Sequence, residues 1–314
     1  MTELTLGQAI RRRRKELNII QEKLCKGICS RGSLSRLESG RQTLSYKRVA
    51  TLLQRLGLPD SRLFALLSGD ELAQEEAERE ARTASVALER TPPEERPAAW
   101  ARFQAALGRL EALGPNDPFV RQCALSLRAV QGREDGPYPF EERLAMLLEA
   151  VRLTVPQFDL EHIGLGPYSG EELRLIMQIA NTYAAGQRYE DAQRVYRMGL
   201  EYLEANGSGL PQYPHLKPSY TANCASALAW AGRYREALEL AEEGIGECLD
   251  YRRYHMLDTL LWVKAYCCYR LDRREEGVRL YRQVYSLLLS TREMRRLQIL
   301  REQVKELTGV DLGE

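Results

Sequence analysis

Apolar residues recur along this chain at the spacing of α-helices. Leu6, Ile10 and Leu17 form a first helical stripe, and residues 45 to 56 carry another that stops at Gly57. The 13 prolines fall between such segments or in their first turns, and no stretch alternates as a half-buried strand would. The pattern therefore predicts an all-α protein.

The N-terminal segments are short and closely spaced, which predicts one compact helical domain over residues 1–68. Helices are expected over 6–17, from Gln21, after Ser30, over 45–56 and over 60–67. The expected core is Leu6, Ile10, Leu24, Leu34, Leu37, Val49, Leu53, Leu56, Leu63 and Leu66.

The run QEKLCKGICSRGSLSRLESG, residues 21–40, is typical of two short helices joined by a tight turn. Ser30 is a suitable N-cap for the second helix, and Leu34 and Leu37 give it a narrow apolar stripe. Its other positions are mostly arginine, serine and glycine, which let a helix approach phosphates and base edges. Gly40 suits the left-handed turn after the helix. We interpret this run as a DNA-reading helix-turn-helix; a small basic hairpin that only packs is the alternative.

The charge of the chain is divided unevenly. Through residue 48 there are 12 basic and 4 acidic residues, a balance of +8, and the remainder carries 33 basic and 40 acidic residues, a balance of −7. Only the N-terminal end is suited to a polyanion. In the basic run Arg11 to Lys15, some side chains must reach phosphates or acidic neighbours, and we interpret them as contacts to the DNA backbone rather than to bases.

The C-terminal half contains an internal repeat. Residues 180–192 match 225–237, and a weaker copy covers 265–277, at spacings of 45 and 40. The pattern resembles the tetratricopeptide repeat (TPR), in which small residues let paired helices cross closely. Segments 98–113, 119–130 and 141–155 are interpreted as diverged repeats and 295–307 as a terminal capping helix. We therefore expect a right-handed TPR-like solenoid over 94–314, joined to the first domain by a helical connector over 69–93.

Residues 21–40 resemble the helix-turn-helix of the Xre, lambda-repressor-like class. In particular, the segment GICSRGSLSRLESGR, residues 27–41, resembles the N-terminal domains of the RRNPP family of peptide-pheromone-regulated transcription regulators, a resemblance that covers about the first seventy residues closely. It implies a cytoplasmic regulator that binds double-stranded DNA and senses a short signalling (quorum-sensing) peptide. Because one such helix reads too few base pairs alone, we expect a homodimer on an inverted-repeat operator. Arg31, Ser33 and Arg36 would approach bases. The expected phosphate contacts are Gln21, Ser30, Ser35 and Arg41, and Gly32 stands where the family often has a longer side chain.

In such a family the peptide lies in the concave groove of the repeats, where asparagines hold its main chain. Helical register places Asn181 best for this role. The expected peptide-binding residues are Arg174, Met177, Asn181, Asn223, Ser226, Trp262 and Tyr266. Trp and Tyr supply apolar area with a polar tip. Internal bridging by the asparagines and inter-repeat packing by the aromatic residues are the alternatives.

Other classes of function find little support in the sequence. The seven cysteines include no CxxC motif and no Cys/His cluster, so we expect reduced thiols, no zinc and no cofactor. There is no apolar run of membrane-spanning length, no secretory signal and no nucleophile or phosphate-loop motif, so we expect no membrane partner and no enzyme. Two rival functions are a DNA-binding regulator whose repeats bind a protein partner, and a phosphatase-like activity on a response regulator.

Overall fold

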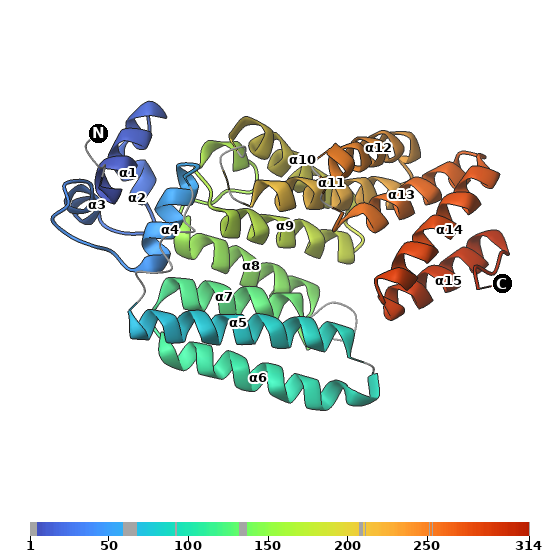
Figure 1. Cartoon of the computed structure of the whole chain (residues 1–314), viewed down its shortest axis with the longest axis horizontal. Helices are drawn as coiled ribbons and strands as arrows, with labels where there is room; N and C mark the ends of the chain where they lie inside the picture. The colour runs from blue at the N-terminus through green and yellow to red at the C-terminus, as the bar shows by residue number, and fades with distance from the viewer. Residues whose placement is uncertain are drawn as a thin grey trace. The chain divides into compact units, whose positions relative to one another are not determined.

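The computed structural model (Figure 1) describes residues 5–58, 68–91, 93–131, 137–206, 210, 212–250, 252 and 254–313. These residues form helices, turns and loops and contain no strand, which confirms the expected all-α class. The chain divides into two compact units. The first comprises Met1–Thr182 and Glu201–Tyr213, and the second comprises Tyr183–Leu200 and Pro214–Glu314.

The first unit begins with four short helices, and their bounds lie close to the predicted ones. They are α1 (Leu6–Glu16), α2 (Gln21–Cys25), α3 (Arg31–Glu38) and α4 (Tyr46–Arg55). The expected fifth helix over 60–67, with Leu63 and Leu66, lies outside the described residues. Left-handed glycines end the segments as predicted, with φ of 72° at Gly40 and 64° at Gly57.

The core of these four helices is the one that the periodicity predicts. Ile10, Leu24 and Leu34 are fully buried, and Leu6 packs against the cluster at its edge. The other predicted members that the structure describes are also buried, namely Leu37, Val49, Leu53 and Leu56. Each side chain comes from a helix too short to be stable alone, so the shared core holds these helices in place.

The rest of the first unit is built mainly from longer helices. They are α5 (Gly69–Arg90), α6 (Arg96–Leu113), α7 (Pro118–Val130), α8 (Phe140–Thr154) and α9 (Gly170–Ala185), with single 3-10 turns at Pro93–Glu95 and Ile163–Leu165. Helix α5, predicted as a connector, lies beside α6 (Figure 1) and shares a core with α6 and α7 that includes Ala81, Phe103, Leu107 and Ala124.

The four N-terminal helices are seated directly on α7 and α8. Phe119 of α7 belongs to the same core cluster as Leu24 and Leu34. A Cβ on Gly27 would lie 1.9 Å from the carbonyl oxygen of Thr154, at the end of α8. Only glycine permits this approach, and Gly27 also has φ of 76°. Within the first unit, the N-terminal helices and the following helices therefore share one packed interior.

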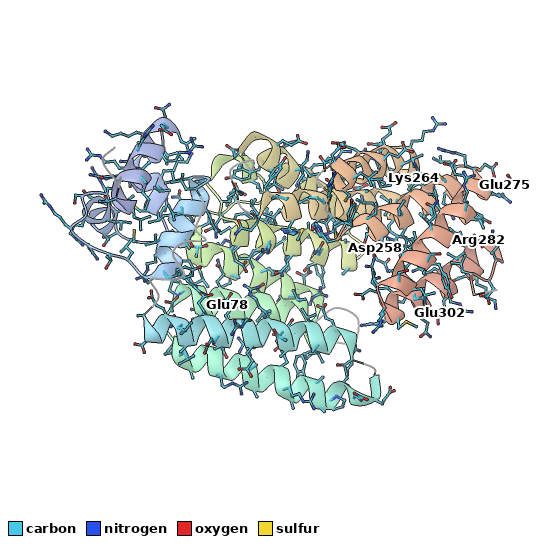
Figure 2. All side chains as sticks on the ribbon, in the orientation of Figure 1. Glu78, Asp258, Lys264, Glu275, Arg282 and Glu302 are labelled. Carbon is cyan, nitrogen blue, oxygen red and sulfur yellow. The ribbon has the colours of Figure 1, made fainter. Side chains whose placement is uncertain are left out.

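The second unit continues the helical series. Its elements are the ends of α9 and α10 (Tyr189–Asn206) that belong to it, then α11 (Tyr213–Trp230), α12 (Tyr234–Asp250), α13 (Leu257–Arg270), α14 (Arg274–Ser290) and α15 (Met294–Thr308). Helix α15 buries Leu297, Leu300 and Val304 while Glu302 is exposed, as Figure 2 shows for its labelled side chain. This amphipathic pattern fits the predicted capping helix.

The sequence repeat corresponds to one turn geometry used three times. The second residue after the first helix of each pair is left-handed, at Gln187, Gly232 and Asp272, with φ of 60°, 80° and 67°. Only the second of these is glycine. The next residue, Arg188, Arg233 or Arg273 in turn, bonds to the acidic residue three positions later. The repeat therefore specifies the turn and its cap as well as the small packing residues.

One prediction about the prolines is wrong. Pro218 lies inside α11, because that helix begins at Tyr213 and not after the proline. The ring has no N–H to offer the carbonyl four residues earlier, so the helix contains one missing bond. Small residues do allow close crossing, as expected: a Cβ on Gly199 would lie 2.2 Å from Cε1 of Tyr220.

Candidate DNA-binding face and ligand pocket

The N-terminus of α3 is fixed by two serines. The Ser30 hydroxyl accepts a hydrogen bond from the Ser33 N–H at 3.0 Å, and the two hydroxyl oxygens lie 2.9 Å apart. The predicted N-cap is confirmed. Ser30, Arg31, Ser35 and Arg36 are exposed, whereas Leu34 and Leu37 face the core. One face of α3 is therefore polar and open to a partner.

Arg36 lies along this open face. Its Nε donates to Oε1 of Gln42 at 2.6 Å, and Nη2 reaches the Ser33 hydroxyl at 3.4 Å. A Cβ on Gly32 would come within 3.4 Å of Arg36 Nη1, so the guanidinium passes close to the glycine. Gly32 thus leaves room for Arg36 and offers no side chain of its own.

A buried carboxylate holds the three helices around this face together. Glu38 of α3 accepts hydrogen bonds from Arg14 of α1 at 2.6 and 2.9 Å and from Gln21 of α2 at 2.8 Å. Burial would raise the pKa of Glu38, but the bonds from Arg14 and Gln21 outweigh it and keep that pKa below its usual value. The side chain of Gln21, predicted as a phosphate contact, is thus engaged within the protein.

Part of the basic run of α1 pairs with acidic neighbours, as expected. Arg12 and Arg13 pair with Glu16, and Arg14 pairs with Glu38. Arg11 and Lys15 are exposed, and they line a recess of about 510 Å³ together with Arg31, Ser35 and other residues of α1, α2 and α3. The recess therefore brings cationic side chains of α1 beside the N-terminal half of α3.

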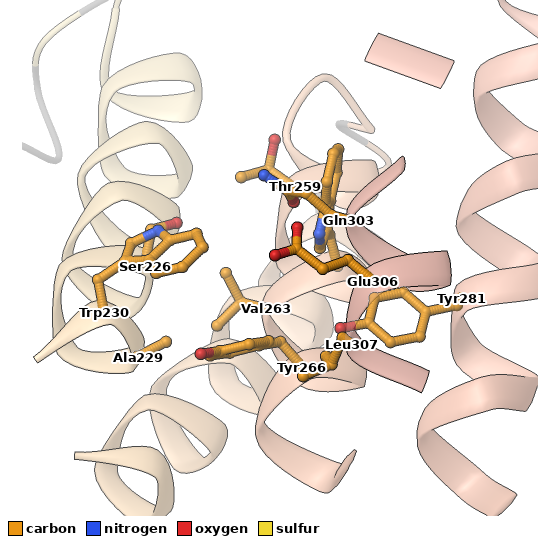
Figure 3. Close-up of a pocket in the computed structure, with 11 residues that line it drawn as sticks. Ser226, Ala229, Trp230, Thr259, Val263, Tyr266, Tyr281, Gln303, Glu306 and Leu307 are labelled. Atoms are coloured by element: carbon orange, nitrogen blue, oxygen red, sulfur yellow. The ribbon is translucent and has the colours of Figure 1, made fainter. Parts of the chain in front are cut away.

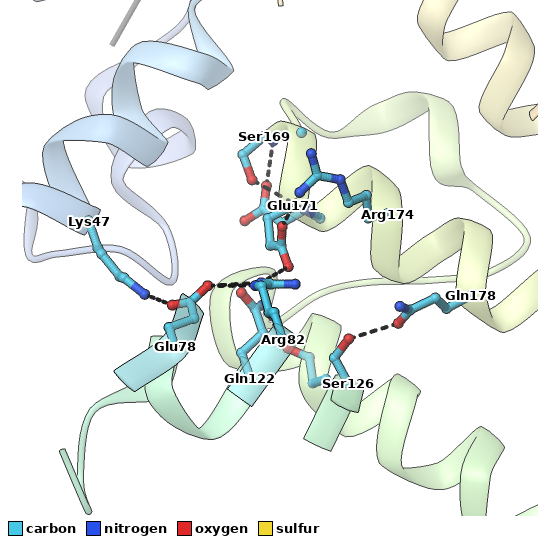
Figure 4. Close-up of polar contacts among 12 residues, drawn as sticks. Lys47, Glu78, Arg82, Gln122, Ser126, Ser169, Glu171, Arg174 and Gln178 are labelled. Carbon is cyan, nitrogen blue, oxygen red and sulfur yellow. Dashed lines mark hydrogen bonds and ion pairs between the residues drawn. The ribbon is translucent and has the colours of Figure 1, made fainter. Parts of the chain in front are cut away.

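A chain of charged side chains runs from α4 to α9 within the first unit (Figure 4). Lys47 contacts Glu78, Glu78 accepts from Arg82 at 2.9 Å, and Arg82 reaches Glu171 at 2.6 Å. Glu171 also bonds Arg174 at 2.9 Å. Burial alone would raise the pKa of Glu171, but Arg82 and Arg174 lower it to about 2.

The second unit contains a pocket of about 570 Å³ (Figure 3). Its walls come from α11, α13, α14 and α15. Its lining residues are Ser226, Ala229, Trp230, Thr259, Trp262, Val263, Tyr266, Tyr281, Gln303, Glu306 and Leu307. Trp230 and Tyr266 lie with ring centroids 5.3 Å apart, and Trp230 is 52% exposed. The pocket is thus rich in aromatic side chains and open to solvent.

The predicted peptide-binding residues fall into two groups. Ser226, Trp262 and Tyr266 line the pocket together, whereas Asn223 lies on α11 outside its lining. The other three are Arg174, Met177 and Asn181, on the part of α9 that belongs to the first unit. As the register predicted, these three are exposed or half-buried, whereas the packing positions of α9 are buried.

Sequence reasoning missed several pocket residues. Gln303, Glu306 and Leu307 were assigned only to a capping helix, and Trp230 was not among the expected peptide-binding residues. A signal was available, since Gln303 and Glu306 are three positions apart on one face of α15. Two histidines of the second unit also lie close together, with the ring centroids of His215 and His255 5.1 Å apart. Within the described ranges, no group of three or more His, Cys, Asp or Glu side chains could hold a metal ion.

Comparison with known proteins confirms the N-terminal assignment. Residues 10–63 match the helix-turn-helix family. This match contains α2 and α3 and most of α1, so the exposed face of α3 belongs to a helix-turn-helix domain. A comparison with curated proteins gives no match. In the part of the chain that the structure describes, no helix is both long and apolar enough to cross a membrane.

The whole chain also resembles solved structures. One is "Crystal Structure of Bacillus thuringiensis PlcR in complex with the peptide PapR7 and DNA", with 17% identity and a TM-score of 0.56, covering 95% of this chain and 99% of that one. Another is PlcR of the same organism in its apo form, with 16% identity and a TM-score of 0.53, covering 96% and 100%. The protein therefore has the fold of PlcR, a helix-turn-helix domain followed by TPR-like helical repeats. The fold implied by the RRNPP resemblance is confirmed.

Proposed function

We propose that this protein is a transcription regulator that binds DNA through α3 and is controlled by a short intracellular signalling peptide. One observation carries the proposal: a helix-turn-helix domain with Arg31 and Arg36 on the exposed face of α3 belongs to a chain that has the fold of PlcR over almost its full length. The PlcR structure was solved with a peptide and DNA. Such a protein acts in the cytoplasm, where both ligands are found.

On DNA, α3 would lie in the major groove. Arg31, Ser33 and Arg36 would approach base edges, and Arg36 could give up its bond to Gln42 for a guanine. Phosphates would meet Arg11 and Lys15 at the recess, and also Ser35 and Arg41, which are exposed. Ser30 and Gln21 would contribute through the polar atoms that their internal bonds leave free. A homodimer would place two such helices on an inverted repeat.

The peptide would contact the repeats. Asn223 is half-buried on α11, and its side-chain amide makes no hydrogen bond to any residue that the structure describes, so it can pair with an extended main chain. Ser226, Trp262 and Tyr266 would receive side chains in the pocket. Arg174, Met177 and Asn181, on the part of α9 that belongs to the first unit, would also contact the peptide, and the contact in each unit is a separate proposal.

Contacts inside the first unit suggest how the two functions communicate. The face of α9 that carries Arg174 is joined through Glu171, Arg82 and Glu78 to Lys47 on α4. A peptide that engages Arg174 competes with Glu171 for it. Such a peptide would therefore bias the charged contacts that seat the helix-turn-helix domain.

The test is binding of the full-length chain to promoter fragments from its own genome, followed by fluorescence anisotropy at about 50 and 200 mM salt. We expect one or a few fragments to bind, with affinity falling steeply as salt rises. Synthetic peptides encoded by short reading frames beside the gene should then change that affinity. Failure to bind any fragment at the lower salt concentration would overturn the DNA-binding function.

A further inference from the structure

The pocket of the second unit has an uneven distribution of charge. Trp230, Trp262, Tyr266 and Tyr281 supply aromatic surface, and Glu306 is the only charged residue among the described residues that line the pocket. Aromatic faces and a carboxylate share one preference, because both are negative and both attract cations. An anionic ligand would meet unfavourable charge here.

Glu306 is poised for a partner that the chain itself does not provide. Its carboxylate points into the pocket between Trp230 and Tyr281 (Figure 3), and it makes no ion pair or hydrogen bond with the described residues. The adjacent Lys305 is directed to Asp311, at 3.5 Å. Most charged side chains nearby on α15 have a partner of opposite charge or a hydrogen bond, whereas the carboxylate of Glu306 has neither among the described residues.

Among the described residues, Arg270 and Arg296 contact the pocket wall, and neither forms an ion pair with Glu306. Arg270 lies 5.8 Å from the ring centroid of Tyr266 and 5.1 Å from that of Tyr234. Arg296 donates to the Thr259 hydroxyl at 3.0 Å and pairs with Asp258. Arg270 shows that this aromatic cluster already accommodates a guanidinium on one side.

We propose that the pocket is a specificity site for a cationic side chain, Lys or Arg, of the signalling peptide. Its charged end would pair with Glu306, and its methylene stem would lie against Trp230, Trp262 and Tyr266. The volume of about 570 Å³ is within the range of small-ligand pockets, about 300–1,000 Å³, and holds one long side chain with a neighbouring apolar one. This inference rests on the proposed peptide-sensing function.

The test uses positional-scanning libraries of heptapeptides, each fixed at one position as Lys, Arg, Gln or Glu. Binding to the full-length Trp100→Phe protein is read from its fluorescence, because the two remaining tryptophans, Trp230 and Trp262, both line the pocket. We expect Lys or Arg at one position to bind about five- to tenfold tighter than Gln, the sum expected for a partly exposed ion pair and a cation–π contact. Glu306→Gln should remove that preference, and Glu306→Lys should transfer it to Glu.

Glu302→Gln is the matched control. Glu302 lies one turn earlier on α15, is exposed and accepts a bond from Gln298 at 3.0 Å, outside the pocket. This variant should keep the wild-type preference. Libraries that bind without a cation preference, or with one that survives Glu306→Gln, would overturn the inference and leave peptide sensing intact. Absence of binding by every library would overturn peptide sensing itself, and the inference with it.

Discussion

Arg55 at the end of α4 and Glu172 in the first turn of α9 form a buried ion pair, 117 positions apart in sequence. Nη2 of Arg55 lies 2.6 Å from Oε1 of Glu172, and the two side chains are 2% and 1% exposed. The same guanidinium donates to the carbonyl oxygens of Leu24, Lys26 and Thr154 at 2.9 to 3.1 Å. One side chain therefore joins the helix-turn-helix domain, the end of α8 and the start of α9.

Replacing Arg55 with Met should destabilise the first unit strongly. The change leaves Glu172 buried without its cation and three carbonyls without a donor, and removal of one partner of a buried pair costs about 3–5 kcal/mol. Urea unfolding followed by circular dichroism gives the free energy. An exposed pair provides the control: Arg121→Ala, which breaks the contact with Glu149 on the surface, should cost less than about 1 kcal/mol.

The double variant Arg55→Met with Glu172→Met separates charge from packing. It removes the uncompensated carboxylate and should recover part of the stability that Arg55→Met loses. If the single variant Arg55→Met unfolds at the same urea concentration as wild type, the buried ion pair contributes nothing to the stability of the first unit.

The contacts of Arg55 illustrate what the sequence could and could not predict. Local patterns gave the ends of α1 to α4, the Ser30 cap and the core around Leu24, because spacing and capping are properties of neighbouring residues. Nothing local connects Arg55 to Glu172. Arg55 reads as an ordinary basic residue in the last turn of a helix, and only the packing of α4 against α9 makes it a buried link.

The pocket of the second unit shows the same limit. Periodicity correctly placed Trp262 and Tyr266 on an accessible face of α13, and both line the pocket. Glu306 lies on α15, 40 positions after Tyr266, and its place in the pocket depends on how α15 packs against the preceding helices. The prediction about Pro218 was wrong for a different reason. Helix α11 tolerates a proline in its second turn, so a proline marks the boundary of a helix only approximately.

Glu171 should make stability depend on acid pH. Its pKa falls from an ordinary value of 4.5 to about 2, because Arg82 and Arg174 outweigh the effect of burial. A lowered pKa contributes stability that is present above about pH 4.5 and is lost as the pH falls towards 2. Wild type should therefore lose more unfolding free energy between pH 5 and 3 than Glu171→Gln does, as measured by urea unfolding at each pH.

The control for this experiment is Glu80→Gln on α5, where the carboxylate is exposed and paired with Arg109. Its pH profile should run parallel to that of wild type. If the pH profile of Glu171→Gln is also parallel to that of wild type, the ion pairs of Glu171 with Arg82 and Arg174 do not contribute to the stability lost in acid.

Replacing two glycines of the second unit with alanine should change the stability of the protein in opposite directions. A Cβ on Gly199 would lie 2.2 Å from the Tyr220 ring, so Gly199→Ala must displace a fully buried side chain and should cost about 1–3 kcal/mol. Gly246 lies inside α12 with nothing within 4 Å of its Cβ position, and Gly246→Ala should stabilise by about 0.5–1 kcal/mol. Thermal unfolding of both variants measures the difference. Equal melting temperatures would contradict the close crossing at Gly199.

If the protein binds DNA as proposed, replacing Arg36 and replacing Arg41 should weaken that binding in different ways. Arg36 lies on the exposed face of α3 beside Gly32, in position to reach a base, whereas Arg41 follows the helix and suits a phosphate. Arg36→Ala should cost about 1–3 kcal/mol on the preferred operator and relax specificity at one base pair. Arg41→Ala should weaken binding to all sequences alike and reduce the salt dependence by about one phosphate contact. Anisotropy titrations against the operator and single-base variants, repeated at several salt concentrations, distinguish the two. Uniform weakening by Arg36→Ala would move Arg36 from base reading to backbone contact and leave Arg31 and Ser33 as the base-reading candidates.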